Sequence, residues 1–132
     1  MSAPADLPVT VFVCTTCRRP IEAAADGFAT PGRELAAVLV PLGDDSVRFE
    51  PVECLSVCKR PATIALSGAD RWGYVVGDLD PALHIAQILE GARAYARSSD
   101  GIVPWRQRPQ IFRKGVIGRI PPRHFQQPEK TP

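Results

Sequence analysis

Hydrophobic and polar positions along the chain predict a strand and then a helix in its first third. Residues 9–13 (Val-Thr-Val-Phe-Val) are apolar or β-branched throughout, which is typical of a strand buried on both faces. Thr30 and Pro31 predict a helix start, with Thr as N-cap and Pro at the first helical position. Pro41 limits this helix, because an interior proline costs about 3 kcal/mol. The apolar face of the helix would consist of Leu35, Val38, Leu39 and Leu42.

The pattern that follows predicts three more strands and a second helix. Residues 47–52 form one strand, and Pro51 within it indicates an edge position, because proline has no N–H for a central ladder. Residues 62–66 and 71–76 predict a hairpin across a Gly-containing turn. Asp80-Pro81 predicts the next helix start, by the same capping logic. The order is β-α-β-β-β-α, which predicts an α/β fold with a four-stranded mixed sheet.

The four cysteines form two close pairs, and each pair directly follows a predicted strand. Two residues separate Cys14 from Cys17, and three separate Cys54 from Cys58. A helix joins the two preceding strands, so we expect the strands to be parallel and to end at the same edge of the sheet. Four thiolates can therefore converge at one end of the molecule. Such a set suits zinc or an iron–sulfur cluster, since both are bound by thiolate sulfur.

The residues alone leave other interpretations of these cysteines open. A redox dithiol of Cys14 and Cys17 is one, because C-x-x-C after the first strand of a βαβ unit is typical of thioredoxin. The thioredoxin pair opens a helix directly, however, whereas Arg18, Arg19 and a long loop follow here. Inert buried thiols are another interpretation, and the pairing at strand ends disfavours it.

A family resemblance is carried by residues 53–64, Glu-Cys-Leu-Ser-Val-Cys-Lys-Arg-Pro-Ala-Thr-Ile. This segment resembles the second cluster motif of thioredoxin-like [2Fe-2S] ferredoxins and of the small [2Fe-2S] subunit of respiratory NADH dehydrogenase. Residues 71–76 followed by Asp80-Pro81 are similar to the closing hairpin and final helix of these families. The resemblance covers about residues 9–98.

This resemblance implies a thioredoxin-like fold and a ferredoxin-like one-electron carrier with a [2Fe-2S] cluster. The implied ligands are Cys14, Cys17, Cys54 and Cys58. It also makes Pro61 the candidate for the cis-proline that thioredoxin-like folds place before the third strand. The chain departs from both families at its first pair, where only two residues separate the cysteines.

The whole chain is also similar to a bacterial family of uncharacterised small predicted metal-binding proteins. The similarity rests on the early Cys-Thr-x-Cys and on residues 100–106, Asp-Gly-Ile-Val-Pro-Trp-Arg. Some members are associated with cobalamin biosynthesis genes, which suggests a pathway but assigns no reaction.

Charge and proline content divide the chain. The net charge is +2, but residues 1–99 contain 9 Lys and Arg against 12 Asp and Glu, whereas residues 100–132 contain 7 against 2. We therefore expect an N-terminal tail (1–8), a cluster-binding domain (9–99) and a basic, proline-rich C-terminal extension (100–132). The extension is too apolar to be wholly disordered, so we expect it to pack partly onto the domain. Docking of an acidic redox partner is its second interpretation, and nucleic-acid binding is disfavoured because its basic residues form no known module.

Other features of the sequence limit the class of protein that we expect. The chain shows neither an apolar run of membrane-spanning length nor a secretory signal, so we expect a cytoplasmic protein, where paired cysteines favour metal or redox chemistry over disulfides. No Ser/His/Asp arrangement, phosphate loop or catalytic carboxylate pair stands out. We therefore expect an electron-transfer protein, and not an enzyme unless the thiol oxidoreductase interpretation holds. Similar ferredoxins often dimerise, which predicts a homodimer.

The sequence also predicts where several further side chains lie. His84 and His124 are expected at the surface, and Trp72 and Tyr74 in the core or at a dimer contact. The cations that flank the cysteines would either offset the negative charge of a bound cluster or form a solvated rim. These cations are Arg18, Arg19, Lys59 and Arg60.

Overall fold

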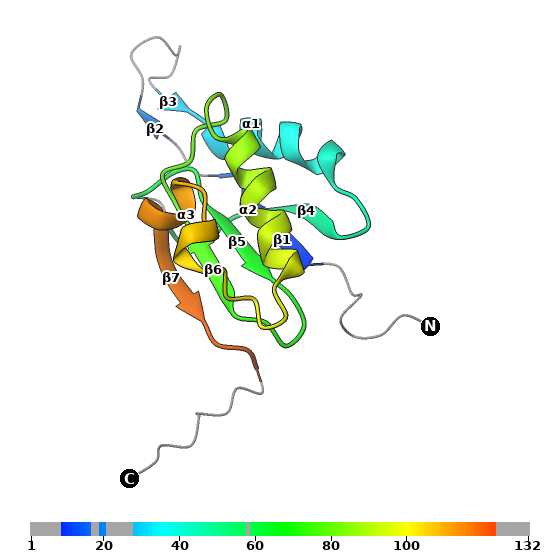
Figure 1. The fold of residues 1–132 in the computed structure, drawn as a ribbon. Coiled ribbons are helices and arrows are strands. Elements are labelled where there is room, and N and C mark those ends of the chain that lie inside the picture. The colour runs from blue at the N-terminus through cyan, green and yellow to red at the C-terminus, as the bar shows by residue number, and fades with distance from the viewer. Residues whose placement is uncertain (1–8, 17–18, 21–27, 58, 124–132) are drawn as a thin grey trace.

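A computed structural model of the chain describes residues 9–16, 19–20, 28–57 and 59–123 (Figure 1). A mixed sheet of five strands has the order β4-β1-β5-β6-β7, and a separate two-stranded sheet pairs β2 with β3. The strands are β1 (Val9–Cys14), β2 (Arg19–Pro20), β3 (Phe28–Ala29), β4 (Val47–Val52), β5 (Ile64–Ser67), β6 (Gly73–Val76) and β7 (Val116–Ile120). The helices are α1 (Pro31–Leu39), α2 (Ile85–Arg97) and α3 (Ile111–Lys114), with single 3-10 turns η2 (Val40–Leu42) and η3 (Trp105–Gln107).

The first half of the sheet follows the sequence pattern. Strands β1 and β4 pair in parallel, with Val9 opposite Val47 and Cys14 opposite Val52, and α1 makes the connection between them. α1 begins with Pro31 after the N-cap Thr30, as predicted. β4 is an edge strand, which suits the proline within it. Strands β5 and β6 form the predicted antiparallel hairpin.

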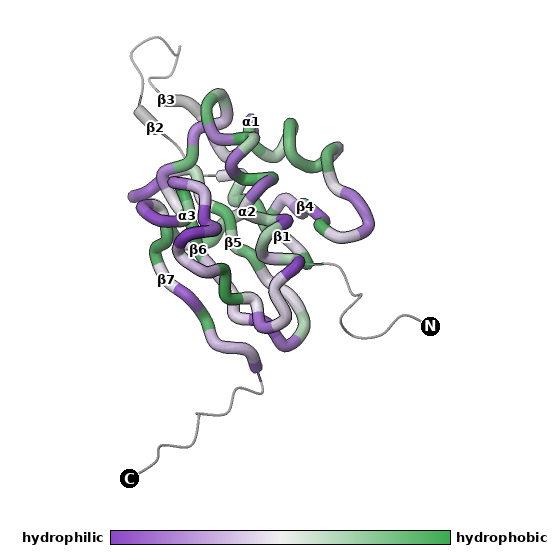
Figure 2. The backbone as a smooth tube through the Cα atoms, viewed as in Figure 1, coloured by the Kyte–Doolittle hydropathy of each residue, from purple (hydrophilic) through white to green (hydrophobic). Residues whose placement is uncertain are grey.

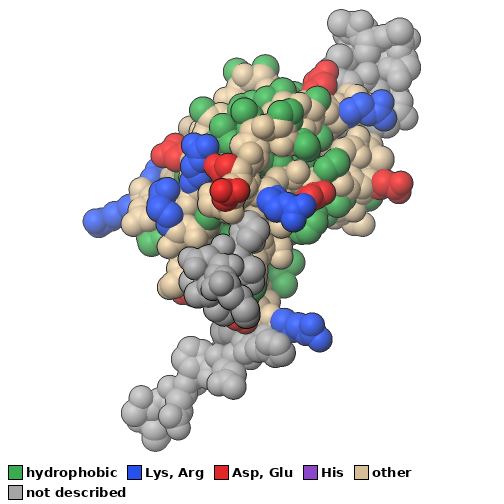
Figure 3. All heavy atoms as spheres, turned by 90° about the vertical axis from the view of Figure 1, so that its right-hand side faces the viewer, with side chains coloured by type: hydrophobic (Ala, Val, Ile, Leu, Met, Phe, Trp, Pro, Cys, Tyr) green, Lys and Arg blue, Asp and Glu red, His purple; other side chains and the backbone are tan. Residues whose placement is uncertain are grey.

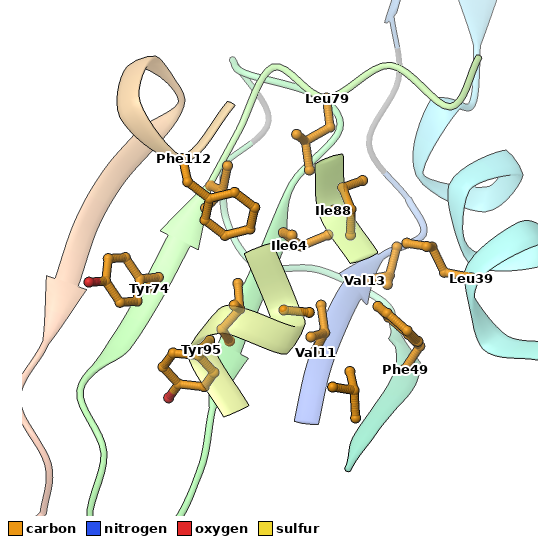
Figure 4. Close-up of a cluster of buried hydrophobic side chains, with 14 of the residues drawn as sticks. Val11, Val13, Leu39, Phe49, Ile64, Tyr74, Leu79, Ile88, Tyr95 and Phe112 are labelled. Carbon is orange, nitrogen blue, oxygen red and sulfur yellow. The ribbon is translucent and has the colours of Figure 1, made fainter. Parts of the chain in front are cut away.

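The hydrophobic core lies between one face of the sheet and the helices. In β1 the buried side chains alternate with half-buried ones, so Val11 and Val13 face the helices (Figure 4). Leu39 from α1, Tyr95 from α2 and Phe112 from α3 meet them there (Figure 4). Hydrophilic residues gather at the turns, as in the segment that joins η2 to β4 (Figure 2). The expectation that β1 is buried on both faces is wrong, because the second face of the sheet carries no helix in the part of the chain described and Thr10 stays half-buried.

The second long helix begins later than predicted. Asp80 and Pro81 open a turn, and α2 starts at Ile85 with His84 as its N-cap. The carboxylate of Asp80 accepts the N–H groups of Ala82 (2.7 Å) and Leu83 (3.2 Å). An Asp carboxylate can accept backbone N–H groups in a turn as well as at the N-terminus of a helix, and Asp80 does so in the turn.

The sheet has five strands instead of the four expected, because the C-terminal residues add one. β7 pairs antiparallel with β6, with Gly73 opposite Ile120. Ile111 and Phe112 are buried in the same core as β1 and α2. The expected partial packing of residues 100–132 onto the preceding domain is therefore confirmed for the residues up to 123 that the structure describes.

Charged side chains of both signs are mixed on the side of α1 and β4 (Figure 3). Ion pairs among the described residues join Arg48 to Glu50 within β4 at 2.8 Å, and Arg93 of α2 to Asp44 of the segment before β4 at 3.9 Å. Their side chains are exposed, so each pair adds little to stability. No helix of the described residues is both long and apolar enough to cross a membrane.

Candidate metal centre

The two cysteine segments leave the sheet side by side. Beyond β1 and β4 the parallel pairing continues, since the N–H of Thr15 donates to the Val52 carbonyl at 2.9 Å and that of Thr16 donates to the Glu53 carbonyl at 3.2 Å. The N–H of Cys14 donates to the Thr63 carbonyl at 3.0 Å on the other side. Cys14 and the segment that begins with Cys54 therefore lie at one end of the sheet, as the strand arrangement predicts.

The two described cysteines differ in environment. Cys14 is fully buried, and its Sγ lies 3.7 Å from the carbonyl oxygen of Glu53, to which the thiol donates. Cys54 is exposed. Cys17 and Cys58, the other two candidate ligands, lie outside the described residues, and the described residues alone bring no three His, Cys, Asp or Glu side chains together as a metal site.

A backbone N–H is directed at the Cys54 sulfur. The donor is Ser56, 3.1 Å from Sγ. Ser56 has φ 61°, a left-handed conformation that non-glycine residues seldom adopt. An N–H aimed at sulfur stabilises the thiolate, which is the form that binds metal. No sequence pattern signals this donor, because it depends on the backbone conformation of one serine.

Gly32 allows the first turn of α1 to lie directly on the Cys14 backbone. A Cβ atom at this position would stand 1.8 Å from the carbonyl oxygen of Cys14 and 2.9 Å from its carbonyl carbon. Gly32 is buried in the second position of the helix. The fit therefore requires glycine, and the Pro31-Gly32 dipeptide at the helix start is a sequence signal that could have pointed to it.

Of the cations that flank the cysteines, Arg60 already has an anionic partner. Its Nε lies 2.8 Å from Oδ2 of Asp78, and a terminal nitrogen lies 2.6 Å from the same oxygen. Its carbonyl accepts the Asp78 N–H at 3.0 Å, which ties the cysteine loop to the end of β6. Lys59 is exposed, Arg18 lies outside the described residues, and the side chain of Arg19 is not described.

The structure agrees with some of the predicted positions of the remaining side chains and differs at others. Tyr74 is buried, and the half-buried Trp72 has the Arg119 guanidinium 4.9 Å above its ring centroid. His84, which was expected at the surface, is half-buried at the N-cap position of α2, where its side chain makes no capping hydrogen bond, and His124 lies outside the described residues. The cis peptide bond joins Pro61 to Ala62, so the expected cis bond before Pro61 is wrong by one residue.

Taken together, the fold and the paired cysteine segments define a thioredoxin-like α/β protein. A structure search supports this class: a thioredoxin-like [2Fe-2S] ferredoxin from Aquifex aeolicus has a TM-score of 0.52 and 17% identity, over 90% of this chain and 99% of that one. The wild type thioredoxin-like [2Fe-2S] ferredoxin from the same organism gives 0.48 and 16%, over 85% of this chain and 98% of that one. At 17% identity the first of these likenesses shows the fold alone.

The family follows from the sequence. The family DUF1636, described as a protein of unknown function, matches residues 11–122. The match spans most of the chain, so the chain belongs to this family. No curated protein matches the sequence.

Proposed function

We propose that the protein is a metal-binding electron carrier that holds a [2Fe-2S] cluster through Cys14, Cys17, Cys54 and Cys58. The observation that carries the proposal is the parallel pairing of the two cysteine segments at one end of a thioredoxin-like sheet. The protein with the TM-score of 0.52 is by name a [2Fe-2S] ferredoxin, which supports the same assignment.

The described residues fit such a cluster in chemistry and position. Cysteine thiolates are the usual ligands of [2Fe-2S] clusters, and a bound cluster would exchange single electrons. Cys14 is buried at the end of a strand fixed on both sides, which holds its sulfur in place. Cys54 is exposed and has an N–H donor on its sulfur, and such donors stabilise anionic sulfur and tune reduction potential.

A zinc centre at the same four cysteines is the alternative, because zinc takes the same thiolate set. A thiol oxidoreductase that uses Cys14 and Cys17 is less well supported. A reactive cysteine needs access to its substrate, and Cys14 is 0% exposed.

The proposal also covers the redox partner of the protein and its location in the cell. An electron carrier needs a redox partner protein, and the basic residues up to Arg123 would favour a partner with an acidic surface. Cytoplasmic location, a homodimer and a link to cobalamin biosynthesis stay predictions. Sedimentation equilibrium of the purified protein tests the homodimer directly.

Anaerobic purification after expression with intact cluster assembly tests the cofactor. We expect a red-brown protein with about two iron and two sulfide per chain, bleached by dithionite, with an electron paramagnetic resonance signal only when reduced. A colourless protein with about one zinc per chain would establish the alternative instead. Colourless protein without iron or zinc would overturn both.

Single Cys→Ser variants test the ligand set. Changing Cys14, Cys17, Cys54 or Cys58 removes one of four thiolates, so each variant is expected to lose most of its iron and visible absorbance. Ser99→Ala, at an exposed site two residues beyond the end of α2, serves as the purification control and is expected to keep both. If only the Cys14 and Cys17 variants change behaviour, the dithiol interpretation gains and the four-thiolate site fails.

A further inference from the structure

A polar pocket with a volume of about 250 Å³ opens beyond the end of β6. Val76 of β6 pairs with Ile64, and Ile64 pairs with Val13, so this end of β6 is the end at which the cysteine segments leave the sheet. The polar side chains of the pocket come from the turn after β6, from α2 and from the segment around α3. They are Asp78, His84, Gln87, Gln110 and Lys114.

Two of these side chains have their acceptor atoms already occupied. Nδ1 of His84 accepts the N–H of Asp80 at 2.9 Å. The proton of the neutral ring is then on Nε2, which is left as a donor. Oε1 of Gln87 accepts the N–H of Ile111 at 3.2 Å, so the NH₂ group of this side chain is the part left for a ligand.

The charges of the lining favour an anion. Lys114 contributes an ammonium group. Asp78 contributes a carboxylate, but Oδ2 of that carboxylate is held by both Nε (2.8 Å) and a terminal nitrogen (2.6 Å) of Arg60. With Asp78 offset by Arg60, the charge of Lys114 is left in excess, and the groups that His84 and Gln87 leave unbound are donors.

We propose that this pocket binds a small oxyanion, the carboxylate or phosphate group of a small molecule. Donors from Nε2 of His84 and the amide of Gln87, together with the Lys114 ammonium, match the several acceptor oxygens of such a group. The volume holds several waters and is smaller than the pockets of drug-sized ligands, which suits a small molecule. The proposal does not depend on which metal the cysteines bind.

Titration of the full-length protein with inorganic phosphate, and separately with acetate, tests the site by amide NMR. We expect saturable shifts of Gly77, Ile111 and Gly115, which line the pocket. Tighter binding of phosphate indicates a phosphate-bearing ligand and tighter binding of acetate a carboxylate, and either supports the proposal. Absence of saturable shifts at these residues with both probes would overturn it.

Matched variants separate the pocket from general attraction of anions. Gln87→Glu keeps the acceptor for Ile111 but replaces the donor group with a carboxylate, and His84→Asn keeps an acceptor for Asp80 while removing the Nε2 donor. Each of these, and Lys114→Gln, is expected to weaken binding at least tenfold with an unchanged melting temperature. Lys59→Gln removes the same charge from an exposed site outside the pocket lining and is expected to change affinity less than twofold. Equal weakening by Lys59→Gln and Lys114→Gln would reject the site.

Discussion

Gly32→Ala is expected to destabilise the protein by about 3 kcal/mol and to lower its melting temperature by on the order of 10 °C. The added Cβ would stand 1.8 Å from the carbonyl oxygen of Cys14. That oxygen belongs to the backbone of β1, so no side chain can rotate away and either α1 or the end of β1 must move. Alanine is favoured over glycine in helices by up to about 1 kcal/mol, and the clash outweighs this gain.

The same substitution displaces the first candidate ligand, so metal content is expected to fall with stability. Thermal and urea unfolding followed by circular dichroism, with metal analysis of the same samples, measures both. Gly118→Ala in β7 is the control, because a Cβ there meets no atom within 4 Å and the residue has no positive φ. It is expected to stay within about 0.5 kcal/mol of the wild type. A Gly32→Ala protein as stable as Gly118→Ala would contradict the close fit of α1 on Cys14.

The features that the sequence predicted correctly depend on local signals. The β1–α1–β4 unit could be predicted because Thr30-Pro31 marks the helix start and the apolar runs on either side have strand length. From that unit alone it follows that both cysteine segments leave the same end of the sheet. The start of α2 was missed for a local reason as well, since Asp80-Pro81 initiates a turn and a helix equally well.

The features that the sequence missed depend on distant partners. β7 pairs with β6 across 39 intervening residues, and its Ile117 (39%) and Ile120 (59%) are exposed, so its large apolar side chains do not mark a buried face. Such an edge strand is defined by its neighbour in the sheet, not by its own pattern. The N–H donor of Ser56 to Cys54 was missed for a similar reason, because a positive φ at serine is imposed by the surrounding loop.

Phe112→Ala is expected to cost about 4 kcal/mol, which would show that the C-terminal residues stabilise the whole domain. Phe112 is 3% exposed, and a Cβ on Gly91 of α2 would lie 2.2 Å from its Cε2 atom. The ring thus packs on the bare backbone of α2, in the same core as Tyr74 and Tyr95. Removing it leaves a cavity beneath α2 that the neighbouring side chains can fill only in part.

Trp105→Ala tests whether the loss of stability comes from removing a buried side chain or from removing any aromatic side chain of the same segment. Trp105 is 60% exposed and has the Arg108 guanidinium 5.6 Å from its ring centroid, so its loss is expected to cost about 1 kcal/mol or less. Phe112→Leu keeps most of the buried volume and is expected to fall between the two alanine variants. Urea unfolding of the three proteins gives the comparison. If Phe112→Ala costs no more than Trp105→Ala, residues 100–123 would be an attached extension and not part of the core, although they supply the fifth strand of the sheet.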